Sequence, residues 1–138
     1  MLRKKSLIGM NGIYVVVEDL GPELKGMLTR SALRKRVEMQ LRTAGIRILK
    51  ELEAAKLPGE PYLYLNLTAL PLGPKRFACC IDLEVHQLVT LAHNSASGHA
   101  STWEQGVVTT GGAEAINDNV DELVFDFICD YLDMNPAG

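Results

Sequence analysis

Alternation of apolar and polar residues over positions 77–91 constrains the fold of this chain more than any other feature. The apolar members recur at every second position through most of this segment: Phe77, Cys79, Ile81, Leu83, Val85, Val89 and Leu91. Successive side chains of a strand point to opposite faces, so this period of two predicts one long strand with a buried face and a wet face. Burial on one side is typical of antiparallel sheets.

Neighbouring segments supply further strands. Alternate leucines predict a strand over residues 62–68, with the leucines facing the core. A turn is expected at 71–75, and a polar loop at 93–99 leads to a strand over 100–110. These three consecutive strands form a meander. Earlier in the chain, the β-branched and aromatic run at 13–17 predicts a buried first strand.

Two segments have the apolar spacing of amphipathic helices. Residues 30–44 form the first, which Thr29 or Ser31 can cap. The second carries one apolar stripe: Ile116, Val120, Leu123, Val124, Phe127 and Tyr131. Between the first helix and the meander, residues 46–49 suit an optional edge strand and residues 50–56 are weakly helical.

Together these elements predict an α+β fold with one antiparallel or mixed sheet of four to five strands. The element order is β-α-(β)-β-β-β-α, and both helices pack on one face of the sheet. With 138 residues, 47% of them hydrophobic and 22% charged, the chain has the size and composition of one globular domain. We expect a single domain over residues 1–138, with residues 1–11 as an exposed lead-in that can be flexible.

Charge and hydropathy narrow the classes of partner. A net charge of −3 offers no cationic field for a phosphate backbone, so no nucleic-acid partner is expected. No apolar run approaches the roughly 20 residues of a membrane helix, so we expect no direct membrane insertion. The basic start has the charge of a signal peptide, but Asn11 and Gly12 interrupt the apolar run behind it. Localisation stays open between the cytoplasm and, if a signal was removed, the periplasm or envelope.

A row of metal-capable side chains lies on the wet face of the longest strand. Cys80, Asp82, Glu84 and His86 share that face. Side chains two positions apart on a strand lie about 6.5–7 Å from each other, so these four could not converge on one ion without help from other strands. A solvated, charge-rich face is the favoured interpretation. Asp82, Glu84 and His86 are retained as a speculative ligand face.

The polar loop after that strand extends the speculative ligand face. His93 and His99 share the loop with Ser95 and Ser97. Neither serine lies in a glycine-elbow motif, and no orienting acid is visible, so a mobile hairpin is favoured over a nucleophile with its base. The sequence therefore predicts no catalytic residue, no cofactor and no metal site, and a protein that is not an enzyme.

The cysteines do not define a framework. They are Cys79, Cys80 and Cys129, an odd number without CxxC spacing, which argues against both a set of disulfides and a zinc knuckle. One bridge from Cys129 to either of the other two stays open.

The two helices differ in their outer sides. The first has a single apolar stripe and a basic outer side, as expected of a solvated covering helix. On the last helix, Phe125, Cys129 and Leu132 project from the side opposite the main stripe, among acidic residues. Either the N-terminal segment or the Lys50–Pro58 loop folds over this second apolar group, or it forms a contact surface between chains.

The sequence carries a resemblance at the level of pattern. The residues that carry it are VEMQLRTAGI at Val37–Ile46, PYLYLNL at Pro61–Leu67 and DFICDYLDMNP at Asp126–Pro136. In these segments and in element order the chain resembles small uncharacterised bacterial β-α-β-β-β-α domains. More distantly it is similar to the amino-terminal domain of the Tol-Pal system's beta-propeller protein and to related envelope domains. The resemblance implies a non-catalytic, export-associated interaction module.

These observations predict a non-catalytic protein–protein interaction or assembly domain, with a homodimer as one form of assembly. Its partner, another protein or a second copy, would meet the outer side of the last helix or the wet sheet face with Tyr62 and Tyr64. The alternative is a small-molecule or metal-binding domain that uses the wet sheet face and the 93–99 loop.

Overall fold

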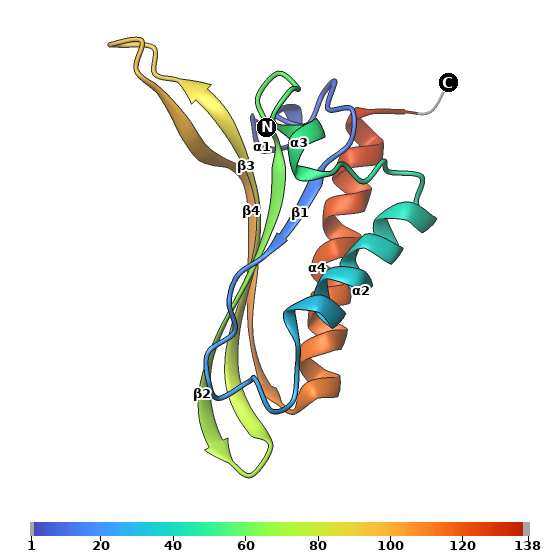
Figure 1. Ribbon diagram of the computed structural model, residues 1–138, viewed down its shortest axis with the longest axis vertical. Helices are drawn as coiled ribbons and strands as arrows, with labels where there is room; N and C mark the ends of the chain where they lie inside the picture. Colours follow the sequence, from blue (N-terminus) through green and yellow to red (C-terminus); the bar gives the residue numbers. More distant parts are fainter. Residues whose placement is uncertain (1, 137–138) are drawn as a thin grey trace.

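The sheet of this protein has four strands in the spatial order β1-β2-β3-β4. The computed structural model describes residues 2–136 (Figure 1). The strands are β1 (Tyr14–Val17), β2 (Tyr62–Gly73), β3 (Arg76–Thr90) and β4 (Ser97–Gly111). β1 runs parallel to β2, whereas the β2–β3 and β3–β4 pairs are antiparallel, so the sheet is mixed.

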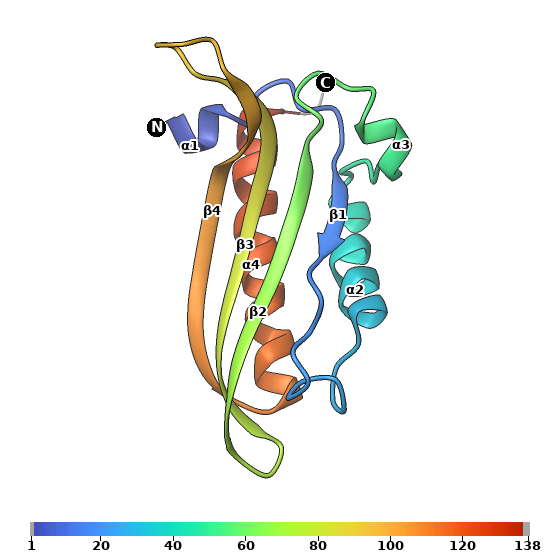
Figure 2. The same cartoon turned by 60° about the vertical axis from the view of Figure 1, so that its left-hand side comes forward.

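Two long helices, α2 (Arg30–Thr43) and α4 (Ala113–Met134), cover one face of the sheet. Figure 2 shows the opposite face in front, free of helices, with α4 behind the strands. Two short helices, α1 (Leu2–Lys5) and α3 (Glu51–Ala54), lie near one end of the sheet. The predicted α+β class, with one mixed sheet and helices packed on it, is confirmed.

Local sequence explains how α2 joins β1 to its parallel neighbour. Parallel strands need a crossover connection, and α2 supplies it. The hydroxyl of Thr29 accepts a hydrogen bond of 3.1 Å from the backbone N–H of Ala32, which caps the first turn. After the last turn Gly45 adopts a φ of +83°, the left-handed conformation that commonly ends a helix.

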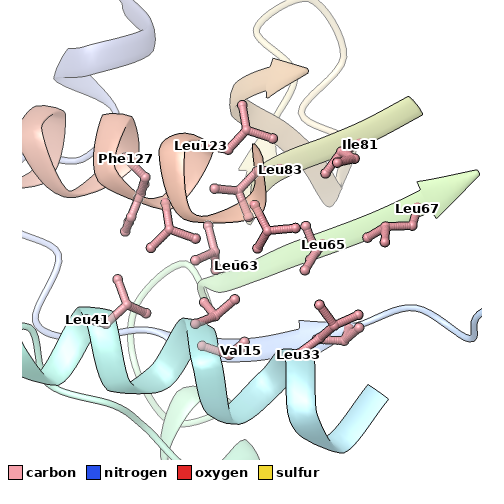
Figure 3. Packing of buried hydrophobic residues seen from close by; sticks show 14 of the residues in the cluster. Val15, Leu33, Leu41, Leu63, Leu65, Leu67, Ile81, Leu83, Leu123 and Phe127 are labelled. Atoms are coloured by element: carbon pink, nitrogen blue, oxygen red, sulfur yellow. The ribbon is translucent and has the colours of Figure 1, made fainter. Parts of the chain in front are cut away.

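The core lies between the sheet and the two long helices (Figure 3). Leu63 and Leu65 from β2 and Leu83 from β3 point toward Leu41 of α2 and Phe127 of α4, and each of these five side chains is at most 1% exposed. Apart from Leu49 and Ala54, the buried hydrophobic residues of the described chain form one cluster.

The leucines of β2 and the alternate residues of β3 from Phe77 to Val85 therefore face the core as the period of two predicts. Beyond Val85 the prediction is wrong: Val89 is only half-buried, and Leu91 lies after β3 and is 46% exposed.

Leu7 and Met10 dock on the core, so over the described residues 2–11 the expectation of an exposed lead-in is wrong. Leu7 is fully buried and Met10 is 9% exposed. The hydroxyl of Tyr131, near the end of α4, donates a hydrogen bond of 2.5 Å to the backbone oxygen of Met10. Four helical residues followed by a turn are too short for a periodic pattern, so no sequence pattern indicates that this segment packs.

Both hairpins are tighter than expected. β2 stays paired with β3 as far as Gly73, and of the turn predicted at 71–75 only Leu72, at an irregularity, and Pro74–Lys75 remain outside the pairing. β4 begins at Ser97, so His99 lies in a strand and not in the loop predicted at 93–99. These hairpin ends project beyond the helices (Figure 1). Because neither of their faces meets the core, burial imposes no alternation there and their composition resembled a loop.

The secondary structure between α2 and β2 is close to the one predicted from the sequence. The optional edge strand at 46–49 is reduced to a single bridge between Ile13 and Ile48. The weakly helical segment at 50–56 contains α3, which is four residues long.

Candidate functional site

An apolar groove runs between α2 and α4 on the outer side of the helix layer, and we call it the α2–α4 groove. It encloses about 670 Å³ and is lined by residues of both helices. Its apolar lining consists of Met39, Ala44, Phe125, Ile128, Cys129 and Leu132. The structure thus places the three residues predicted on the outer side of the last helix at one surface.

Several apolar side chains of the groove are exposed to solvent. Phe125 is 51% exposed, Leu132 is 40% exposed and Met39 of α2 is 67% exposed. Met39 was missed in the sequence because α2 was interpreted as a helix with a single apolar stripe. Its position became informative only once α2 and α4 were known to lie side by side.

Neither segment that was expected to fold over Phe125, Cys129 and Leu132 does so. The N-terminal segment docks on the other flank of α4, where Lys4 Nζ lies 2.5 Å from Asp133 Oδ2. The Lys50–Pro58 loop, with α3, lies beside the β1 end of the sheet. Within residues 2–136 the groove is therefore uncovered, and the folding-over interpretation is wrong.

An ion pair fixes the two helices at one end of the groove. Arg36 Nε and Nη2 each lie 2.7 Å from an oxygen of Asp121, a bidentate arrangement. This hydrogen bonding raises the pKa of the Arg36 guanidinium. Gln40 adds a bond of 3.2 Å from its side-chain nitrogen to the backbone oxygen of Asp121. The bonds set Arg36 of α2 level with Asp121 of α4.

The open face of the sheet carries the other predicted interface residues, Tyr62 and Tyr64. Tyr62 stacks on His86 of β3 with ring centroids 5.0 Å apart, and its centroid lies 5.8 Å from that of His99 on β4. Tyr64 packs against the other side of the cluster, 5.3 Å from His86. Four aromatic rings from three strands therefore form one group on this face.

Tyr64 also forms a hydrogen bond with Glu18, the residue that follows β1. Its hydroxyl donates a hydrogen bond of 2.6 Å to Glu18. This bond raises the pKa of Tyr64 to about 12 and lowers the pKa of the Glu18 carboxyl. The phenol is therefore protonated and the carboxylate charged near neutral pH.

The row of metal-capable residues lies on the open face as predicted, but it divides into pairs. Cys80 Sγ lies 3.7 Å from Asp82 Oδ2, and His86 Nε2 lies 3.3 Å from Glu84 Oε1 without the geometry of a hydrogen bond. His93 lies in the exposed turn after β3. In the part of the chain that the structure describes, no three His, Cys, Asp or Glu side chains are grouped to hold a metal ion.

All three cysteines are free thiols, so the bridge left open for Cys129 is absent. Cys79 points into the core, where burial raises its pKa to about 11, whereas Cys129 is exposed on α4. The two side chains lie on opposite sides of α4, and the alternation of β3 turns Cys80 farther away still.

Comparison with protein families and curated proteins found neither a matching family nor a matching relative. Across residues 2–136, no helix combines the length and apolar composition needed to cross a membrane.

Proposed function

We propose that this chain is a non-catalytic protein–protein interaction or assembly domain and that the α2–α4 groove is its contact surface. One observation carries the proposal: Phe125, Met39 and Leu132 converge on one concave surface and remain exposed. Single exposed apolar residues are ordinary on protein surfaces, but a contiguous apolar hollow with a polar rim is typical of an interface.

The composition of the groove supports this role. Fully burying a Phe or Met side chain contributes about 1.5–3 kcal/mol, so covering Phe125 and Met39 would add substantially to the affinity of a complex. Aromatic residues and methionine are also enriched at interfaces. The resemblance to export-associated envelope domains implies a role of the same kind, and we include that association in the proposal.

A photo-crosslinking experiment tests the contact surface without assuming its partner. Benzoylphenylalanine at position 125, introduced in the cells that make the protein, is expected to give a covalent adduct of higher mass after irradiation. The matched control places the same residue at Val108, which is 75% exposed on the open sheet face. Equal adduct formation at both positions, or none at 125, would contradict the proposal.

A second candidate function rests on a hollow of about 310 Å³ beside the aromatic group of the sheet face. Tyr14, Tyr62 and Tyr64 line it together with Glu51 and Glu60. Tyrosine rings and carboxylates together favour an organic cation, because the ring faces and the acids both attract positive charge. The Arg34 guanidinium already lies 5.3 Å from the centre of the Tyr14 ring.

Thermal melting separates this candidate from a metal-binding function. Tetramethylammonium chloride is expected to raise the melting temperature more than sodium chloride of equal strength, since a ligand that binds the folded state stabilises it. The increment should disappear in Tyr62→Leu and persist in Val108→Ser. A rise with zinc chloride alone would favour a metal instead, and no rise with either would remove the candidate.

A further inference from the structure

The outer ridges of α2 and α4, on either side of the α2–α4 groove, carry opposite charges. Exposed residues at spacings of four and three form each ridge, so each lies along one face of its helix. The α2 ridge consists of Lys35, Met39 and Arg42. The α4 ridge consists of Asp118, Glu122, Phe125, Cys129 and Leu132. The α2 ridge is basic with an apolar centre, and the α4 ridge is acidic at its start and apolar beyond.

The two helices run in the same general direction along the sheet (Figures 1 and 2). This direction decides how a second copy could meet the surface. A two-fold axis parallel to the helices would lay α2 of each copy on α4 of the other. An axis across the helices would lay α2 on α2 and α4 on α4 in opposite directions. Lys35 would then face Arg42, and the acidic start of the α4 ridge would face its apolar end.

We propose that the partner at the α2–α4 groove is a second copy of this chain, related by a two-fold axis parallel to α2 and α4. This inference rests on the proposed function and names the occupant of the same surface. Charge complementarity selects it, because under this axis Lys35 faces the acidic start of the α4 ridge. Under the other axis Lys35 faces Arg42, and the acids of α4 are buried against apolar residues. The resulting contact is a layer of four helices with the two sheets outside.

The heights of the residues along the helices agree with this arrangement. Rotation about an axis parallel to the helices leaves each residue at its own height. Because Arg36 is level with Asp121, the neighbouring Lys35 of the second copy faces the acidic start of the α4 ridge, near Glu122. Met39 of the second copy, one turn farther on, comes level with Phe125. The apolar centre of one ridge thus covers the apolar part of the other.

Light scattering after size exclusion tests for the second copy. The wild-type chain is expected at twice its 15.1 kDa mass. Phe125→Asp should weaken the dimer at least about 30-fold, the equivalent of about 2 kcal/mol at an interface hot spot. Met39→Glu, on the other helix, should do the same. Val108→Asp, an exposed apolar position on the opposite face, should leave the dimer intact.

Exchange of charge tests the pairing of the ridges. Lys35→Glu with Arg42→Glu makes the α2 ridge acidic, and Asp118→Lys with Glu122→Lys makes the α4 ridge basic. Each double variant is expected to be monomeric alone, because both of its equivalent contacts become repulsive. A 1:1 mixture should form a heterodimer, since opposite charges then face each other at both contacts. Dimers of either variant alone, as stable as wild type, would overturn the pairing.

Engineered cysteines test the direction of the axis. Under the proposed axis, Lys35 lies across from Glu122 of the second copy, so a 1:1 mixture of Lys35→Cys and Glu122→Cys, each with Cys129→Ser, should give a covalent dimer on mild oxidation. Neither variant should give a covalent dimer by itself. If Lys35→Cys instead crosslinks with Arg42→Cys in the same background, α2 lies on α2, and the parallel axis is wrong.

The proposal and the function on which it rests fail in different ways. A wild-type chain that is monomeric at 100 µM while position 125 still crosslinks to another protein would overturn the second copy but keep the contact surface. A dimer that Val108→Asp abolishes and Phe125→Asp spares would overturn both.

Discussion

Replacing Phe127 with alanine is expected to lower the free energy of unfolding by about 3–5 kcal/mol, the usual loss for a large aromatic side chain removed from a core. Phe127 is fully buried. Its ring packs edge-to-face on Trp103 with centroids 5.4 Å apart and lies 5.9 Å from the ring of Tyr131. The cavity left by alanine would border both aromatic residues and could not collapse without moving α4 from the sheet. Urea unfolding followed by circular dichroism measures the loss.

Phe125 is the matched control for this experiment, since it is the same residue type two positions away on the same helix. Phe125→Ala should change the stability of the isolated chain by less than about 0.5 kcal/mol, as expected at an exposed site, while it should weaken the proposed dimer. The two variants should therefore separate folding from assembly. A loss of several kcal/mol in dilute Phe125→Ala, or less than 1 kcal/mol in Phe127→Ala, would contradict the assignment of the two faces of α4.

This contrast within α4 was visible in the sequence. The helical period places Phe127 on the main apolar stripe and Phe125 on the opposite side, whatever the helix packs against. The period of two in β3 was equally informative, because one face of a buried sheet must be apolar along its whole length. Where a periodic pattern is long and burial enforces it, sequence and structure agree.

The rest of the candidate site depends on which elements become neighbours. Met39 is an ordinary exposed residue until α2 is placed beside Phe125 and Leu132, and no local pattern specifies that placement. His99 is similar. A shift in the β3–β4 pairing, with Val85 opposite Trp103 and His86 opposite Ser101, sets which residues of β4 face Tyr62. Such a bulge leaves no periodic signal in so short a segment.

The outer ridges of α2 and α4 carry opposite charges, which favours their pairing between two copies of the chain. The basic outer side of α2 was interpreted as solvated, and on an isolated helix that interpretation is sufficient. Beside the acidic ridge of α4, the positions of these basic residues along the helix matter, because they decide which two-fold axis brings opposite charges together in a dimer. Screening should accordingly weaken the dimer as ionic strength rises, since these charges are exposed.

Replacing Leu7 with alanine is expected to cost about 2–5 kcal/mol of unfolding free energy, as for other fully buried leucines. The surrounding segment is held by polar contacts as well, since Asn135 donates a bond of 2.8 Å to the backbone oxygen of Leu7 and Gln87 one of 3.1 Å to that of Ser6. The guanidinium of Arg3 in α1 lies 4.7 Å from the centre of the Trp103 ring, so release of α1 from the flank of α4 would uncover Trp103. Thermal or urea unfolding, with indole fluorescence as a second readout, measures both effects.

Ile8 provides the matched control, because this neighbour of Leu7 is 60% exposed. Ile8→Ala should stay within about 0.5 kcal/mol of wild type. If Leu7→Ala were equally silent, the first residues would contribute nothing to the fold and the expectation of a free lead-in would stand. If Leu7→Ala destabilises the chain while the dimer survives at concentrations where the chain is folded, the N-terminal segment stabilises the flank of α4 toward β4. Survival of the dimer would show that the α2–α4 groove does not depend on the N-terminal segment.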